Sequence, residues 1–156
     1  MLITTGRKPD ALSRLMAKAL AAAIPGSLLE NRGRRTLGAL IAKARKKHFT
    51  RVCTIYKDGG KPCQMAFISL GEDAGWEWLS PKITVRKAAA SIIPRNFHSP
   101  SLELSGTRKA TIANLLSVSD ASGGSEPESE ISAGAASLSV SLGDKKVLQL
   151  EVSYEN

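Results

Sequence analysis

The sequence has no apolar run near the ~20 residues that a membrane-spanning helix needs, and its first residues lack the basic-then-apolar order of a secretory signal. Cysteine and histidine are scarce, and Cys53, Cys63, His48 and His98 stand at spacings that match no zinc finger or knuckle. No glycine pair has the sequence context of a phosphate or dinucleotide cradle. We therefore expect a cytoplasmic protein that binds no membrane, no structural zinc and no cofactor.

Aromatic residues make up only 4% of the chain, too few for the stacking platform of an RNP-type RNA-binding domain. Trp76 and Trp78 alternate, so both indoles should lie on one face of a short strand. Such a pair is more often a core or partner-protein contact than a base-stacking site. No carboxylate pair stands at a usable spacing from a histidine or lysine, so we expect no enzyme activity.

Positive charge is what the chain has in excess, with 22 lysines and arginines against 14 acidic residues and a net charge of +8. Residues 1–50 hold 11 cations and 2 anions, whereas residues 101–156 hold 4 cations and 8 anions. This asymmetry predicts a basic front that faces a polyanion, and nucleic acid is the expected partner. The length of 156 residues and 42% hydrophobic content suit one compact domain.

The first half of the chain shows the periodicities of strands and helices in alternation. Its expected elements are strands at residues 2–5 and 27–30, helices that open at Asp10 and Thr36, and a hairpin formed by residues 51–57 and 62–70. Cys53 and Cys63 fall diagonally on the two arms of that hairpin, which favours buried thiols over a disulfide.

The second half repeats this order less clearly, after an alanine-rich joint at residues 88–90. Apolar residues 92–93 open it, a helix is expected at about residues 107–116, and residues 136–142 and 147–154 form a second hairpin. The acidic, Ser- and Gly-rich segment 119–134 is expected to be a flexible loop. We place the boundary between two related halves near residues 88 and 89.

Two basic loops follow the first two strands. Because these strands should be parallel, both loops should emerge at the same edge of the sheet, and each leads into a helix N-terminus that favours an anion. Arginine forks and flanking hydroxyls suit phosphate binding. The expected RNA-binding residues are Thr5, Arg7, Lys8, Arg14, Lys18, Asn31, Arg32, Arg34 and Arg35. Taken singly, any of these arginines is more often a solvated loop charge than a binding residue, but two such clusters at one edge favour binding.

A second cationic cluster, Lys43, Arg45, Lys46 and Lys47, ends the second expected helix. Cations there stabilise the helix dipole by roughly 0.3–1 kcal/mol each, which is sufficient reason for their presence. In the expected strand–helix–strand–helix order, the end of this helix lies at the opposite edge of the sheet from the two arginine loops.

The motif Leu2-Ile3-Thr4-Thr5-Gly6-Arg7-Lys8-Pro9 resembles the opening of the Brix domain, a family of ribosome-assembly proteins. The resemblance continues through Ile24-Pro25-Gly26-Ser27, Asn31-Arg32-Gly33 and the hairpin at residues 58–62, and covers residues 2–70; Asn96-Phe97 and Gly106-Thr107-Arg108 resemble the start of the family's second half. Residues 71–75 depart from the family's Gly-Pro-Thr segment. The compact chain suits an archaeal member, similar to the small-subunit processome Brix proteins of eukaryotes.

The resemblance implies an α/β fold of two related half-domains, each similar to the anticodon-binding domain of class II aminoacyl-tRNA synthetases, with helices packed on mixed sheets. It implies a single Brix domain over residues 1–156, a monomer, that binds ribosomal RNA or its precursor during subunit assembly and rRNA processing. Other ribosome-assembly proteins are further candidate partners. The alternative is a protein-interaction scaffold whose acidic second half and tryptophans bind a basic assembly partner, with incidental RNA contact.

Overall fold

The computed structural model describes residues 1–57, 63–94, 96–118 and 127–155. The protein is a mixed α/β structure in which one continuous nine-stranded sheet has the order β2-β1-β3-β4-β5-β9-β8-β7-β6. The strands are β1 (Leu2–Thr5), β2 (Leu28–Glu30), β3 (Arg51–Tyr56), β4 (Cys63–Leu70), β5 (Trp76–Ala90), β6 (Glu103–Ser105), β7 (Ser129–Ala133), β8 (Ser137–Leu142) and β9 (Lys145–Glu155). The helices are α1 (Ala11–Ala23), α2 (Leu37–Lys46) and α3 (Lys109–Leu116).

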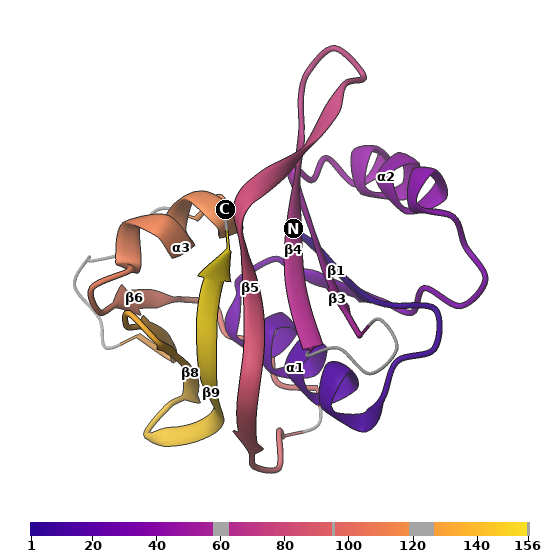
Figure 1. The fold of residues 1–156 in the computed structure, drawn as a ribbon. Helices are drawn as coiled ribbons and strands as arrows, with labels where there is room; N and C mark the ends of the chain where they lie inside the picture. The colour runs from indigo at the N-terminus through magenta and orange to yellow at the C-terminus, as the bar shows by residue number, and fades with distance from the viewer. Residues whose placement is uncertain (58–62, 95, 119–126, 156) are drawn as a thin grey trace.

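The two halves of the chain share one pairing pattern. In the first half β1 pairs with β3 in parallel, and β3, β4 and β5 follow as antiparallel neighbours. In the second half β6 pairs with β7 in parallel, and β7, β8 and β9 are antiparallel. Antiparallel pairing of β5 with β9 joins the halves into a single sheet, where we had expected separate sheets (Figure 1). In the first half, β2 pairs with β1 at the edge of the sheet, and α2 packs against β3.

Helix α1 is the centre of the structure. Asp10 caps its N-terminus by accepting a hydrogen bond from the Ser13 backbone N–H at 2.7 Å. The helix buries more than one side, because it packs against strands of both half-sheets, namely β1, β2, β3, β7, β8 and β9. Small residues such as Ala17 and Ala21 permit this contact on two sides. Leu15 is 37% exposed, although the spacing of apolar residues along this helix predicts it to be buried.

Helix α2 covers the opposite face of the first half-sheet. Successive residues of a strand point to opposite faces, and Val52 packs beneath Leu40 and Ile41 of α2 while its neighbour Cys53 belongs to the larger cluster around α1. Figure 1 shows α1 behind β4 and β5, and α2 well separated from it. Thr36 caps α2, as the sequence predicted.

The predicted hairpins are confirmed, and both cysteines are free and buried. Burial in apolar surroundings raises the pKa of the Cys53 and Cys63 thiols above the ordinary value, so both remain protonated and act as core groups. The turn at residues 58–62 lies outside the described residues. No helix of the described segments is long and apolar enough to cross a membrane.

The prediction was wrong in three places in the second half. Residues 88–90 are the end of strand β5 and not a joint, and residues 92–93 form no strand. Strand β7 instead pairs in parallel with β6, a strand of three residues that the sequence did not indicate. The expected loop 119–134 contains strand β7, whose Ser129, Ile131 and Ala133 are buried; residues 119–126 of that loop lie outside the described residues.

Serine donors from three segments bind the last carbonyl groups of α1. Ser27 Oγ donates to Ala21 O at 3.0 Å, the Ser99 N–H donates to Ala22 O at 2.8 Å, and Ser129 Oγ donates to Ala23 O at 2.7 Å. A helix leaves its last four carbonyl groups without partners inside the helix. Two of these three donors come from the second half, so the end of α1 ties the two halves together.

Candidate nucleic-acid interface

The two basic loops lie side by side, as predicted. Strands β1 and β2 are parallel with Leu2 opposite Leu28 and Thr4 opposite Glu30, so their carboxyl ends meet at one edge of the sheet. The Thr4 hydroxyl donates to Glu30 O at 2.9 Å and fixes this register at the point where both strands end. The loop at residues 6–9 and the loop at residues 31–36 therefore leave the sheet together.

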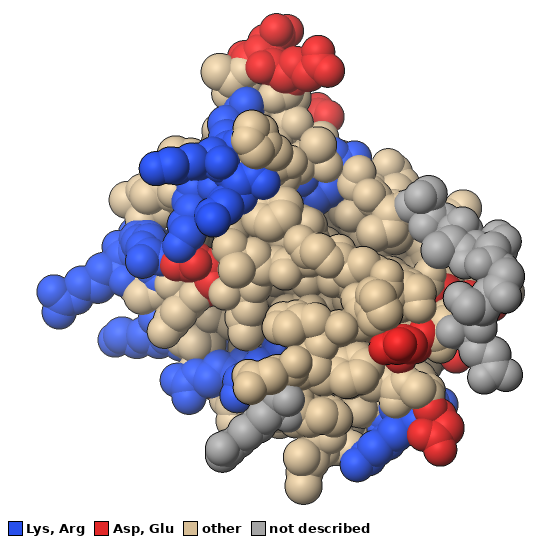
Figure 2. All heavy atoms as spheres, turned by 180° about the vertical axis from the view of Figure 1, so that it is seen from behind, with Lys and Arg blue, Asp and Glu red and all other residues tan. Residues whose placement is uncertain are grey.

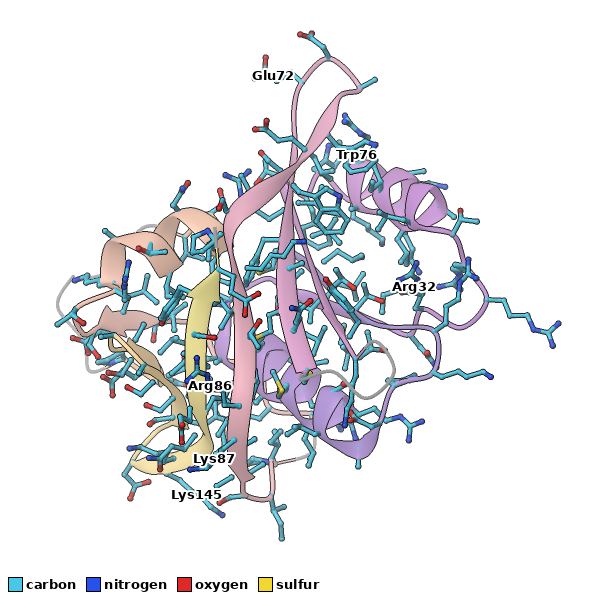
Figure 3. The ribbon with its side chains drawn as sticks, in the orientation of Figure 1. Arg32, Glu72, Trp76, Arg86, Lys87 and Lys145 are labelled. Atoms are coloured by element: carbon cyan, nitrogen blue, oxygen red, sulfur yellow. The ribbon has the colours of Figure 1, made fainter. Side chains whose placement is uncertain are left out.

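A tight turn shapes the second loop. The Arg35 N–H donates to Arg32 O at 3.0 Å, and Gly33 has a φ of +53°, which residues with a side chain seldom adopt. Arg32, Arg34 and Arg35 all lie within this turn. Figure 3 shows Arg32 on this loop, on the opposite side of the molecule from Lys145.

Most of the predicted phosphate-binding cations are exposed. Figure 2 shows Lys and Arg side chains gathered on one flank of the molecule. The exposed members of the predicted set are Arg7, Lys8, Arg14, Lys18, Arg34 and Arg35, and Arg32 is half-buried. Thr5 is buried, with 6% of its surface exposed, at the end of β1.

Glu30 binds two cations beside these loops. Its Oε2 accepts from Lys43 Nζ at 2.6 Å, and its Oε1 is paired with the Arg35 guanidinium. The hydrogen bond from Lys43, and then that from Arg35, hold the pKa of the Glu30 carboxyl below its ordinary value. The expectation that Lys43 lies at the opposite edge was therefore wrong: its long side chain reaches back from the second turn of α2 to the end of β2.

The two helix N-termini at this edge already have partners. The Asp10 carboxylate takes the N–H of Ser13 at the start of α1, and these hydrogen bonds lower the pKa of Asp10. The Thr36 hydroxyl takes the N–H of Ala39 at the start of α2. Each cap takes one N–H of its helix N-terminus. Anion binding at these N-termini stays a prediction.

A cavity of about 180 Å³ brings four of the predicted residues together. Thr5, Arg14, Lys18 and Asn31 line it, with Pro9, Ala17, Leu29 and Glu30 as neighbours that the sequence analysis did not select. Leu29 is 38% exposed on the short edge strand β2. In the run Leu28-Leu29-Glu30, strand alternation puts the two leucines on opposite faces of the sheet, and this was the available signal for it.

The remaining sequence candidates lie elsewhere. Trp76 and Trp78 share one face of β5, as predicted, with ring centroids 6.1 Å apart and both indoles 46% exposed. Arg45 of α2 donates to Gly71 O and Gly75 O, which fixes the tip of the β4–β5 arm beside these tryptophans. Within the described segments, no group of three or more potential ligands could hold a metal ion.

Comparison with curated proteins identifies two archaeal relatives. The chain is 35% identical over 77 residues to a probable Brix domain-containing ribosomal biogenesis protein of Pyrococcus horikoshii, a match that covers 49% of this chain and 34% of the relative. It is 33% identical over 79 residues to the protein of the same description from Pyrococcus abyssi, covering 51% and 35%. The match thus spans about a third of these relatives' length. No family model matches the chain.

Solved structures match over nearly the whole chain. A probable ribosomal biogenesis protein from Aeropyrum pernix has a TM-score of 0.75 at 16% identity, covering 97% of this chain and 94% of that one. Mil, an archaeal Imp4-like protein, has a TM-score of 0.64 at 18% identity, covering 97% and 96%. These structures share the fold, and the curated relatives share the sequence of about half the chain. The resemblance to the Brix family is therefore confirmed: the chain is similar in sequence, over about half its length, to two archaeal Brix domain-containing ribosomal biogenesis proteins, and similar in fold to two solved archaeal structures.

Proposed function

We propose that the chain is an RNA-binding ribosome biogenesis factor without enzyme activity, which binds ribosomal RNA or its precursor during subunit assembly. The observation that carries this proposal is the parallel register of β1 and β2, because it puts two cationic loops at one edge. The sequence similarity to two proteins described as ribosomal biogenesis proteins supports the biological setting.

In this proposal the cations bind the phosphate backbone. Arg7, Lys8 and Arg34 extend from exposed loop positions, and Arg14 and Lys18 continue the same surface along α1. Arginine forks can bind two phosphate oxygens at once, which orients the RNA strand as well as attracting it. Contacts of this kind position an RNA without reading its sequence.

A salt titration of RNA binding tests the proposal. With single-stranded oligouridylate, log K should fall linearly with log[salt], with a slope of about −0.7 for each phosphate bound. We expect a slope that reports several contacts. A flat response, or no binding at low salt, would contradict phosphate recognition.

The second candidate function is a protein-interaction scaffold, and the exposed tryptophan pair on the β4–β5 arm favours it. Exposed aromatic pairs are common at the centres of protein interfaces. Capture of assembly proteins from an extract with and without nuclease separates the two functions. Partners lost on nuclease treatment depend on RNA, and partners retained bind the protein itself.

A further inference from the structure

A second cavity, of about 330 Å³, continues the first along α1. Lys18 and Leu29 line both cavities, so the two form consecutive parts of one groove between the edge strand β2, helix α1 and residues 93–94 and 96–98. The residues that line only the second part are Ala21, Ala22, Ile93, Pro94, Asn96, Phe97 and His98.

The floor of this groove is apolar and its rim is cationic. Ala17 and Ala21 of α1 contribute only methyl groups to the floor, and Leu29 adds a larger apolar surface. Arg14 and Lys18 stand one helical turn apart on the exposed side of α1, along the same groove. The acid that lines it, Glu30, is paired with two cations.

One wall of the groove carries an aromatic ring that the core holds in place. Phe97 is half-buried and packs against the central apolar cluster. The hydrogen bond from the Ser99 N–H to Ala22 O ties its segment to the end of α1. Asn31 and Asn96 bring amide groups to the first and second parts of the groove, respectively. The groove thus combines a fixed ring, an apolar floor, amides and cations.

We propose that this groove receives unpaired bases of single-stranded RNA, an inference that rests on the RNA binding proposed above and names the form of RNA that binds. Bases in a duplex are stacked inside the helix, whereas splayed bases can lie on aromatic and apolar side chains. Phe97 and Leu29 supply those contacts, and the amides can bind base edges. The strand's phosphates then follow Lys18 and Arg14 toward the loop at residues 31–36.

The test compares single-stranded oligouridylate that carries one 2-aminopurine with an RNA duplex of the same length, for the full chain and two variants. Phe97→Leu keeps the apolar packing and removes the aromatic ring, and Leu29→Gln changes a half-exposed side chain. Ile92→Gln is the matched control, because Ile92 is 83% exposed and does not line the groove. Thermal unfolding verifies that each variant folds.

We expect the full chain to bind the single strand more tightly than the duplex, with a change in 2-aminopurine fluorescence. Phe97→Leu and Leu29→Gln should each weaken single-strand binding about fivefold or more, the loss expected for one stacked base, while duplex binding and the salt slope stay the same. Ile92→Gln should change nothing. Equal affinity for both RNAs, unaffected by these variants, would overturn the base groove and leave phosphate binding intact. Absence of binding to both RNAs would refute the proposed function itself.

Discussion

Lys43 Nζ lies 2.6 Å from Glu30 Oε2, and this contact ties the middle of α2 to the carboxyl end of β2. Residues 1–50 contain two acids, Asp10 and Glu30. Asp10 caps α1 and Glu30 is shared by Lys43 and Arg35. The two acids of residues 1–50 therefore serve local structure, and Glu30 also holds two of the segment's cations in place. Glu30 should therefore stabilise the fold and at the same time weaken RNA binding.

Replacing Glu30 with Gln should strengthen RNA binding. The change removes one negative charge and frees Lys43 and Arg35, so the salt slope should steepen by about 0.7 for each cation that then meets a phosphate. Filter binding over a salt series measures this. Glu103→Gln, which removes an exposed acid from the second half, is the control and should leave the slope unchanged. Weaker binding by Glu30→Gln would indicate that Glu30 positions the arginine loop.

The stability of the protein should depend on Glu30 and Asp10 in acid. The pKa of each carboxyl is lowered in the folded state, by Lys43 for Glu30 and by the Ser13 hydrogen bonds for Asp10. Their contribution is therefore fully present above the unfolded pKa, ~4, and is lost as the pH falls through the folded pKa. Urea midpoints between neutral pH and acid should fall less steeply for an Asp10→Asn, Glu30→Gln double variant. Equal slopes for both proteins would contradict these pKa shifts.

Charge reversal at the arginine turn should weaken RNA binding without unfolding the protein. Converting Arg32 and Arg34 to Glu replaces two cations at the shared edge, and we expect a loss of roughly tenfold or more in affinity at low salt. The matched control is Lys145→Glu with Lys146→Glu, two exposed lysines at the start of β9. Figure 3 shows Lys145 on the opposite side of the molecule from Arg32. If the control weakens binding equally, the shared edge is not the RNA site.

The first half of the fold was predictable because its signals are local. Asp10 and Thr36 are strong cap residues, and the sequence Asp-Gly-Gly-Lys, typical of turns, separates two β-rich runs. The second half was not, because β6 has three residues and β7 alternates Ser129, Ile131 and Ala133 as its buried side. Because serine and alanine do not produce an alternation of apolar and polar residues, the sequence does not indicate β7 as a strand. Tertiary packing is what makes this segment a buried strand.

The candidate site was predictable only in part, for a similar reason. Parallel strand order brought the two loops together, and that follows from connection rules. The groove along α1 does not follow from connection rules, because Phe97 and Leu29, which line it, come from segments far apart in the sequence. Similarly, the reach of Lys43 to Glu30 depends on side-chain conformation and not on the order of elements.

Ser129→Ala should destabilise the protein by about 1–3 kcal/mol, the cost of leaving a buried acceptor without its donor. Ser129 is 1% exposed, and its Oγ lies 2.7 Å from Ala23 O and 2.7 Å from Ser101 O, so its one proton can be donated to either carbonyl. Ser137→Ala, at an exposed position of β8, is the control and should change stability little. Chemical denaturation measures both. Equal effects would show that the bond between the halves adds no stability.

Gly106→Ala should cost more stability than any other glycine-to-alanine change in the second half's described turns. Gly106 has a φ of +88°, and a β carbon there would overlap the carbonyl group of Ala133, which accepts the Arg108 N–H at 2.8 Å. Gly143 also has a positive φ, +58°, but no atom lies within 4 Å of its β-carbon position. We expect a loss of about 1 kcal/mol for Gly143→Ala from backbone strain alone, and roughly 3 kcal/mol or more for Gly106→Ala, because the start of α3 must also move away from β7. Urea denaturation of both variants checks the difference, and equal losses would mean that the close approach of Gly106 to β7 is not required.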